Sequence, residues 1–133
     1  MSKSYGNGIF LKDSLADIEP KVRGMYTDPA RLRRSDPGNP DVCNLFPYHV
    51  LLADESTQAE IREGCTGATF GCVDCKKIFL RNLGAFLEPL HERRRALEAK
   101  PELVRQILMD GNARAGESVR ETMQMVREAM HLL

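Results

Sequence analysis

Four cysteines are the residues whose types and spacing most clearly predict chemistry in this sequence. They are Cys43, Cys65, Cys72 and Cys75, which gives the pattern C-x21-C-x6-C-x2-C. A C-x2-C turn brings two thiolates to one centre, and two further thiolates complete a tetrahedral sulfur site. Such a site suits Zn²⁺ or an iron–sulfur cluster, and spacing alone does not separate the two. All four cysteines of the chain are then used.

Other interpretations of these cysteines remain open at this point. Four unrelated buried cysteines would act as small apolar side chains. A thioredoxin-like redox pair is disfavoured, because no alternation of strands and helices surrounds the C-x2-C. His49 follows Cys43 closely in the sequence and could substitute as a ligand. A cytoplasmic protein keeps its thiols reduced, which favours metal binding over disulfides.

Basic side chains near the cysteines predict contacts with a polyanion. One group precedes Cys43 and another follows Cys75; their members are Arg31, Arg33 and Arg34, and Lys76, Lys77 and Arg81. A third group, residues 93–95, ends the strongest helical pattern. The simpler interpretation is solvated helix faces with local ion pairs. We expect phosphate contacts from the first two groups, but no aromatic platform for stacking RNA bases is visible.

Overall composition excludes several classes of function. The 133 residues include 19 basic and 19 acidic side chains, so net charge predicts no general attraction to nucleic acid or membranes, and a polyanion site must come from local clustering. No apolar run approaches the roughly 20 residues that cross a bilayer. No secretory leader is recognisable, so we expect a cytoplasmic protein. His91 and His131 stand alone, and no hydrolytic or acid–base constellation is present.

The pattern of apolar residues predicts an all-α fold, because no segment alternates with period two. The strongest helix begins at residue 73, with Phe79, Leu83, Phe86 and Leu87 on one face. Other helices are expected over 14–26, 42–53 and 56–64, with loops at 35–41 and 66–70. Beyond Pro101 we expect two more helices. The first would bury Leu103, Val104, Ile107 and Leu108, and the second carries Val119, Met123, Val126 and Met130.

Several motifs together resemble the bacterial tryptophanyl-tRNA synthetases, which are class I aminoacyl-tRNA synthetases. The opening MSKS is similar to the KMSKS loop of that class without its first lysine. The run TDPARLRRSDPG, the segment GCVDCKK and the final VREAMHLL are similar to the tryptophanyl family. The resemblance covers essentially the whole chain, and the TDPARLRRSDPG run is its most specific part.

The resemblance implies an enzyme that activates tryptophan with ATP before attaching it to tRNA. By that match Lys3, aided by Ser2 and Ser4, would contact the ATP phosphates as a mobile point charge. The four cysteines would hold a 4Fe-4S cluster, with zinc as the alternative. The helices would bind the anticodon region of the tRNA for tryptophan.

The same resemblance predicts the domain organisation. Residues 1–12 would be a remnant of the KMSKS loop with a short extended linker, and residues 13–133 a helical C-terminal anticodon-binding domain. No nucleotide-binding half is recognisable, so we expect ATP use only in the full-length enzyme and no ligase activity from this chain alone. The N-terminal catalytic domain would be a partner. The alternatives are a ligase acting in trans with a separate catalytic half, and a stand-alone helical metal-binding interaction or redox module.

Overall fold

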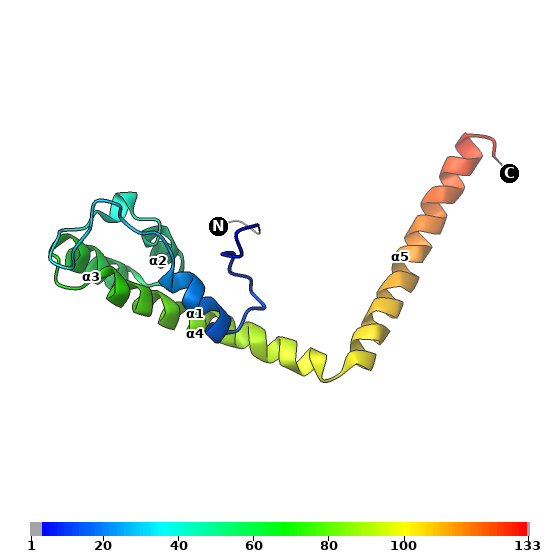
Figure 1. Cartoon of the computed structure of the whole chain (residues 1–133). Coiled ribbons are helices and arrows are strands. Elements are labelled where there is room, and N and C mark those ends of the chain that lie inside the picture. The colour runs from blue at the N-terminus through cyan, green and yellow to red at the C-terminus, as the bar shows by residue number, and fades with distance from the viewer. Residues whose placement is uncertain (1–3, 133) are drawn as a thin grey trace. The chain divides into compact units, whose positions relative to one another are not determined.

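The computed structural model describes residues 4–132, and within that range every regular element is a helix (Figure 1). The elements are α1 (Leu15–Arg23), the 3₁₀ helix η1 (Pro40–Val42), α2 (Phe46–Leu52), α3 (Glu55–Thr66), α4 (Cys72–Glu98) and α5 (Pro101–Ala129). The predicted all-α class is therefore confirmed for the described residues. The chain divides into two compact units, residues 1–91 and 92–133.

The core of the first unit forms between α1, α4 and the residues leading into α2. Its buried members are Ile18, Val22, Leu45, Phe79, Leu83 and Leu87. The three residues from α4 recur every four positions, which puts them on one stripe of the helix, as predicted. Phe86 was expected on the same face, but it is 49% exposed because its position is rotated away from that stripe.

Helix α1 begins with a capping turn at Ser14. The Asp17 backbone N–H donates to Ser14 Oγ at 3.2 Å, and the Ser14 hydroxyl donates to the Asp17 carboxylate at 2.6 Å. The helix ends at Arg23, earlier than predicted, and Gly24 is its C-cap. Pro20 lies inside the helix, beyond its first turn. At that position it has no backbone N–H to donate to the helical hydrogen bonds.

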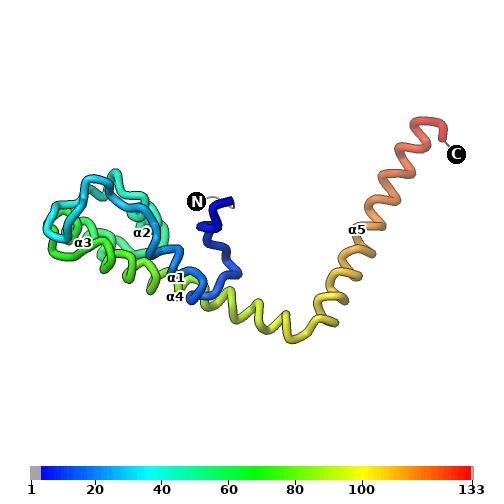
Figure 2. The backbone as a smooth tube through the Cα atoms, in the orientation of Figure 1, coloured from blue at the N-terminus to red at the C-terminus, as the bar shows by residue number. Residues whose placement is uncertain are grey.

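The chain between α1 and α2 passes beside the junction of α3 and α4 (Figure 2). Side-chain hydrogen bonds hold the part of this segment that precedes η1. The buried Asp28 carboxylate accepts from the backbone N–H groups of Ala30 at 2.9 Å and Asn39 at 2.7 Å. Helix α2 starts later than predicted because Pro47 falls in its first turn, where a missing N–H costs no helical bond.

The second unit contains the end of α4 and the single long helix α5, where two helices were predicted. No residue of α5 is buried. The expectation that Leu103, Val104, Ile107 and Leu108 form a buried side is therefore wrong for this structure: Leu103 is 46% exposed and Ile107 55%. Helical periodicity predicts an apolar face but not what covers it. Among the described residues, no helix combines the length and apolarity that a membrane span requires.

Candidate metal centre

The four cysteines come from three elements of the first unit, η1, α3 and α4. Cys43 is the C-cap of η1, and Cys65 lies in the last turn of α3. Cys72 is the first residue of α4, and Cys75 lies one turn further along the same helix. All four are free thiols of intermediate burial. The short turn between α3 and α4 places both helix ends beside the segment that follows α1.

The thiols perturb one another electrostatically. Burial raises the pKa of Cys75 to about 12, and Cys43, Cys65 and Cys72 add to the rise. Burial also raises the pKa of Cys65, while Arg31 opposes that rise. Cys43 and Cys75 both pack against the same buried core of the first unit. Without a metal these two thiols stay protonated at neutral pH.

The metal centre itself stays a prediction. Among the described residues, no group of three or more His, Cys, Asp or Glu side chains is placed so that it could hold a metal ion. The structure thus gathers the predicted cysteines in one region without converging them on a point.

His49 contacts one of the cysteines. It is fully buried on α2, and its Nε2 lies 3.1 Å from Cys75 Sγ. Its ring packs edge-on against Phe79, with 5.9 Å between the ring centres. Burial lowers the pKa of His49, which keeps the imidazole neutral at neutral pH. The sequence suggested a link to Cys43, whereas the contact is with Cys75, two helices away.

Arg31 contacts a second cysteine. Its Nη1 donates to Cys65 Sγ at 3.7 Å, and its Nη2 donates to the carbonyls of Phe70 at 2.6 Å and Arg34 at 2.9 Å. One guanidinium therefore ties the segment after α1 to the turn between α3 and α4. The sequence suggested a phosphate contact for Arg31. Its position beside Cys65 had no signal in the sequence, because 34 positions separate the two residues.

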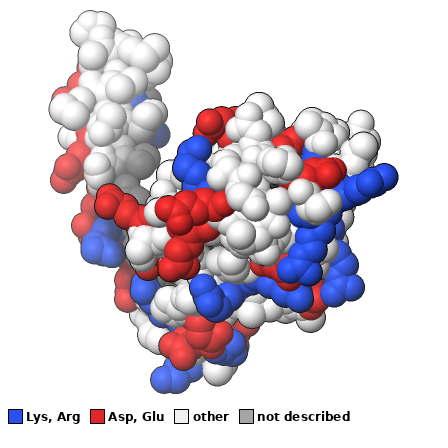
Figure 3. Space-filling view, turned by 90° about the vertical axis from the view of Figure 1, so that its left-hand side faces the viewer, with Lys and Arg blue, Asp and Glu red and all other residues white. Residues whose placement is uncertain are grey.

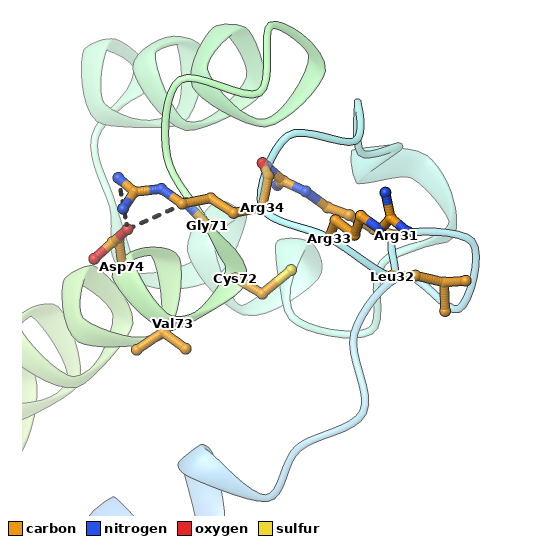
Figure 4. A pocket seen from close by; sticks show the side chains of 8 residues that line it. All are labelled: Arg31, Leu32, Arg33, Arg34, Gly71, Cys72, Val73 and Asp74. Carbon is orange, nitrogen blue, oxygen red and sulfur yellow. Dashed lines mark hydrogen bonds and ion pairs between the residues drawn. The ribbon is translucent and has the colours of Figure 1, made fainter.

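A cavity of about 410 Å³ opens beside Cys72. It is lined by residues 31–34 and 71–74 (Figure 4). The Cys72 sulfur points toward the loop that carries the arginines. Asp74 Oδ2 accepts from the backbone N–H of Gly71 at 3.1 Å and lies 3.6 Å from Arg34 Nη2. Arg33 is exposed, and its guanidinium makes no hydrogen bond or ion pair with residues 4–132.

The other predicted phosphate-binding residues differ in their surroundings. Lys76 Nζ donates to the carbonyls of Arg23 and Met25, each at 2.7 Å, and so satisfies the end of α1. Lys77 is largely exposed, 3.8 Å from Asp74, and Arg81 is exposed and close enough to lower the pKa of Asp54. Figure 3 shows Lys and Arg side chains gathered on the right-hand side of the face it draws.

The predicted phosphate loop falls mostly outside the described residues. Ser2 and Lys3 lie outside the range, and Ser4 lies in an exposed turn. The chain that follows is attached to α1 by Lys21, whose Nζ donates to the Gly8 carbonyl at 2.9 Å and to the Asp13 carboxylate at 2.6 Å.

Comparison with known proteins places this arrangement in a family. The family model described as tRNA synthetases class I (W and Y) matches residues 1–88. The chain belongs to this family of class I tRNA synthetases.

Within that family, the relatives compared are tryptophan–tRNA ligases, which confirms the predicted resemblance. The chain is 43% identical to the enzyme of Aquifex aeolicus over 133 residues and 45% identical to that of Thermotoga maritima over 134 aligned positions. It spans 34% and 41% of the length of these two proteins. A crystal structure of Campylobacter jejuni tryptophanyl-tRNA synthetase, complexed with ADP and tryptophan, matches 99% of the chain with a TM-score of 0.88 and 28% identity, over 41% of its own length.

Proposed function

We propose that this chain supplies the tRNA anticodon-binding region of a tryptophan–tRNA ligase, which attaches tryptophan to its tRNA at the expense of ATP. The observation that carries the proposal is the similarity of the whole chain to tryptophan–tRNA ligases, in sequence and in fold. In the full-length enzyme Ser2, Lys3 and Ser4 would contact ATP, and the protein would act in the cytoplasm. Ligase activity would require the catalytic half, on the same polypeptide or supplied in trans.

The tRNA contacts in this proposal come from exposed basic side chains. The charges that the phosphates of a tRNA backbone could reach are those of Arg33 and Arg34 at the cavity and of Lys77 and Arg81 along α4. Their weak or absent ion pairs leave these charges available, since long exposed pairs contribute little.

Arg31 and Lys76 have a different part in the proposed interface. Both side chains donate hydrogen bonds to backbone carbonyls, so they stabilise the shape of the surface rather than bind phosphate directly.

We further propose that Cys43, Cys65, Cys72 and Cys75 hold a 4Fe-4S cluster, with zinc as the alternative. Zinc requires all its ligands about 2.3 Å from one atom, whereas a cluster distributes four thiolates over four irons. The resemblance to the synthetase family favours the cluster over zinc, and the contribution of Cys43, Cys65 and Cys72 to the raised pKa of Cys75 supports one shared site.

One feature near the sulfurs fits an anionic group. Arg31 Nε is a buried donor without a hydrogen-bond partner in the described part of the chain, and the same guanidinium contacts the Cys65 sulfur. When bound, the cluster would supply a cross-link among η1, α3 and α4 and a one-electron couple. Its binding would stabilise the first unit, because metal affinity adds to folding free energy.

A stand-alone redox module is the competing function. A thiol–disulfide module needs a thiolate with a lowered pKa, and the raised pKa of Cys75 opposes that form of it. A reversible cluster couple in a protein without RNA affinity would favour the redox module instead.

RNA binding by the purified chain tests the proposed function. We expect the anticodon stem-loop of the tRNA for tryptophan to bind more tightly than an unrelated stem-loop at low salt, with affinity falling as salt rises. The double variant Arg33→Ala, Arg34→Ala should weaken binding about tenfold or more. Arg114→Ala, an exposed charge change on α5, is the matched control and should bind as the parent does. Equal affinity for both stem-loops would contradict the anticodon-binding role.

A further inference from the structure

We infer that Arg31 and His49 are positioning residues for the cysteine site: their N–H groups orient the sulfurs of Cys65 and Cys75 and raise the reduction potential of the cluster they hold. The inference rests on the proposed cluster and goes beyond it by naming the side chains that control it.

The first observation is that two different cysteines each have one nitrogen donor from a distant part of the chain. Arg31 Nη1 reaches Cys65 Sγ at 3.7 Å, and His49 Nε2 lies 3.1 Å from Cys75 Sγ. A thiolate only accepts hydrogen bonds, so Nε2 carries the ring proton once Cys75 binds metal. Both contacts then become N–H···S⁻ bonds, which are stronger than their neutral counterparts.

The second observation is the unpaired nitrogens on the same two side chains. Arg31 Nε and His49 Nδ1 are the buried side-chain N or O atoms without a partner among residues 4–132. An unpaired buried donor is unfavourable and calls for a physical reason. For Arg31 that reason is an additional acceptor at the cysteine site, and the sulfur atoms of a cluster supply one. For His49 the relevant observation is instead the 3.1 Å contact of Nε2 with Cys75 Sγ, because protonation of Nε2 leaves Nδ1 as a lone pair that no cluster sulfur can satisfy.

The third observation is that neither side chain is free to move away. Arg31 is held by the Phe70 and Arg34 carbonyls, and His49 is fully buried against Phe79. Their N–H dipoles are therefore fixed before the cluster binds. Fixed donors and a cation stabilise the more negative state of a nearby group, here the reduced cluster. The full charge of Arg31 should act more strongly than the neutral ring of His49.

The test is a redox titration of the intact chain with its cluster. One electron from dithionite reduces the cluster from the 2+ to the 1+ state, and no bond to sulfur is broken. We expect Arg31→Met to lower the equilibrium constant for reduction about tenfold, or about 59 mV, and His49→Phe to lower it several-fold. Arg31→Lys should recover part of the loss by restoring the charge. Arg114→Met, outside the first unit, should leave the potential unchanged.

The outcomes separate the inference from the cluster proposal. A full complement of iron and sulfide with an unchanged potential in both Arg31→Met and His49→Phe overturns the inference and leaves the cluster in place. Parent protein without iron and sulfide overturns both.

Milder variants keep the test decisive if the cluster is lost. Loss in Arg31→Met and His49→Phe, with retention in Arg31→Lys and His49→Gln, supports positioning by N–H groups. Equal loss in all four variants overturns it.

Discussion

The Cβ that an alanine would place at Gly38 would lie 2.5 Å from Cys65 Sγ and 3.2 Å from Arg31 Cδ. The backbone of Gly38 is held in place, because its N–H donates to the Cys65 carbonyl at 2.9 Å. Only glycine therefore fits at position 38, between the Cys65 sulfur and the Arg31 side chain.

Gly38→Ala should therefore displace the Cys65 sulfur and reduce metal binding. We expect the variant to lose more than half of its bound metal and about 1–3 kcal/mol of unfolding free energy. Iron or zinc content and urea denaturation measure the two effects. Gly111→Ala is the control, because nothing lies within 4 Å of its added Cβ and alanine favours a helix by about 1 kcal/mol. Normal metal content in Gly38→Ala would refute the close packing.

Phe79 is the central core residue of the first unit, only 2% exposed and packed against Tyr48 and His49. Phe79→Ala should lower the free energy of unfolding by about 3–5 kcal/mol, because it leaves a cavity in the core. Val104→Ala on the exposed face of α5 should change it by less than about 0.5 kcal/mol. Equal losses in denaturant unfolding would show that α5 is covered in solution.

The contrast between these two positions shows what the sequence could predict. The spacing of Phe79, Leu83 and Leu87 predicted a helix and its apolar face. That face is buried in the structure because residues of α1 pack against it. The same kind of pattern in α5 predicted burial that the structure does not show. Periodicity reports which face is apolar, and burial depends on a second surface that the pattern does not describe.

The cysteine region was predictable in part for a related reason. The C-x2-C spacing is local, the chain's two remaining cysteines completed the predicted set, and the resemblance to a synthetase family favoured a cluster over zinc. The contacts of Arg31 with Cys65 and of His49 with Cys75 join residues 34 and 26 positions apart. No local rule links such pairs, so they became visible only in the fold.

Asp54 links acid stability to the helix that carries Cys65. It is the N-cap of α3, and its pKa is lowered mainly by the Thr57 backbone N–H, with help from the Ser56 hydroxyl. A lowered folded-state pKa means that this stabilisation is present above the unfolded value of 3.8 and is lost as pH falls below it. Asp54→Asn should keep the cap and remove this part of the acid sensitivity, whereas Asp54→Ala should destabilise α3 at pH 7 as well. Melting curves between pH 2 and 7 would compare the three proteins, and identical acid profiles would contradict the assignment.

Lys76 and Lys77 are adjacent in sequence but should respond oppositely to substitution. Lys76→Met removes two hydrogen bonds, to the carbonyls of Arg23 and Met25, and should cost about 1 kcal/mol or more of stability. Lys77→Met should leave stability within about 0.5 kcal/mol and weaken RNA binding severalfold, with a smaller salt dependence. Thermal melts and stem-loop titrations distinguish the roles. A stability loss in Lys77→Met without an effect on RNA would reverse the assignment.

Elemental analysis of the anaerobically purified chain tests directly what the four cysteines bind. We expect a brown protein with about four iron and four sulfide per chain, and loss of both in Cys75→Ser. One zinc per chain, or no metal and unchanged melting in Cys75→Ser, would contradict the cluster.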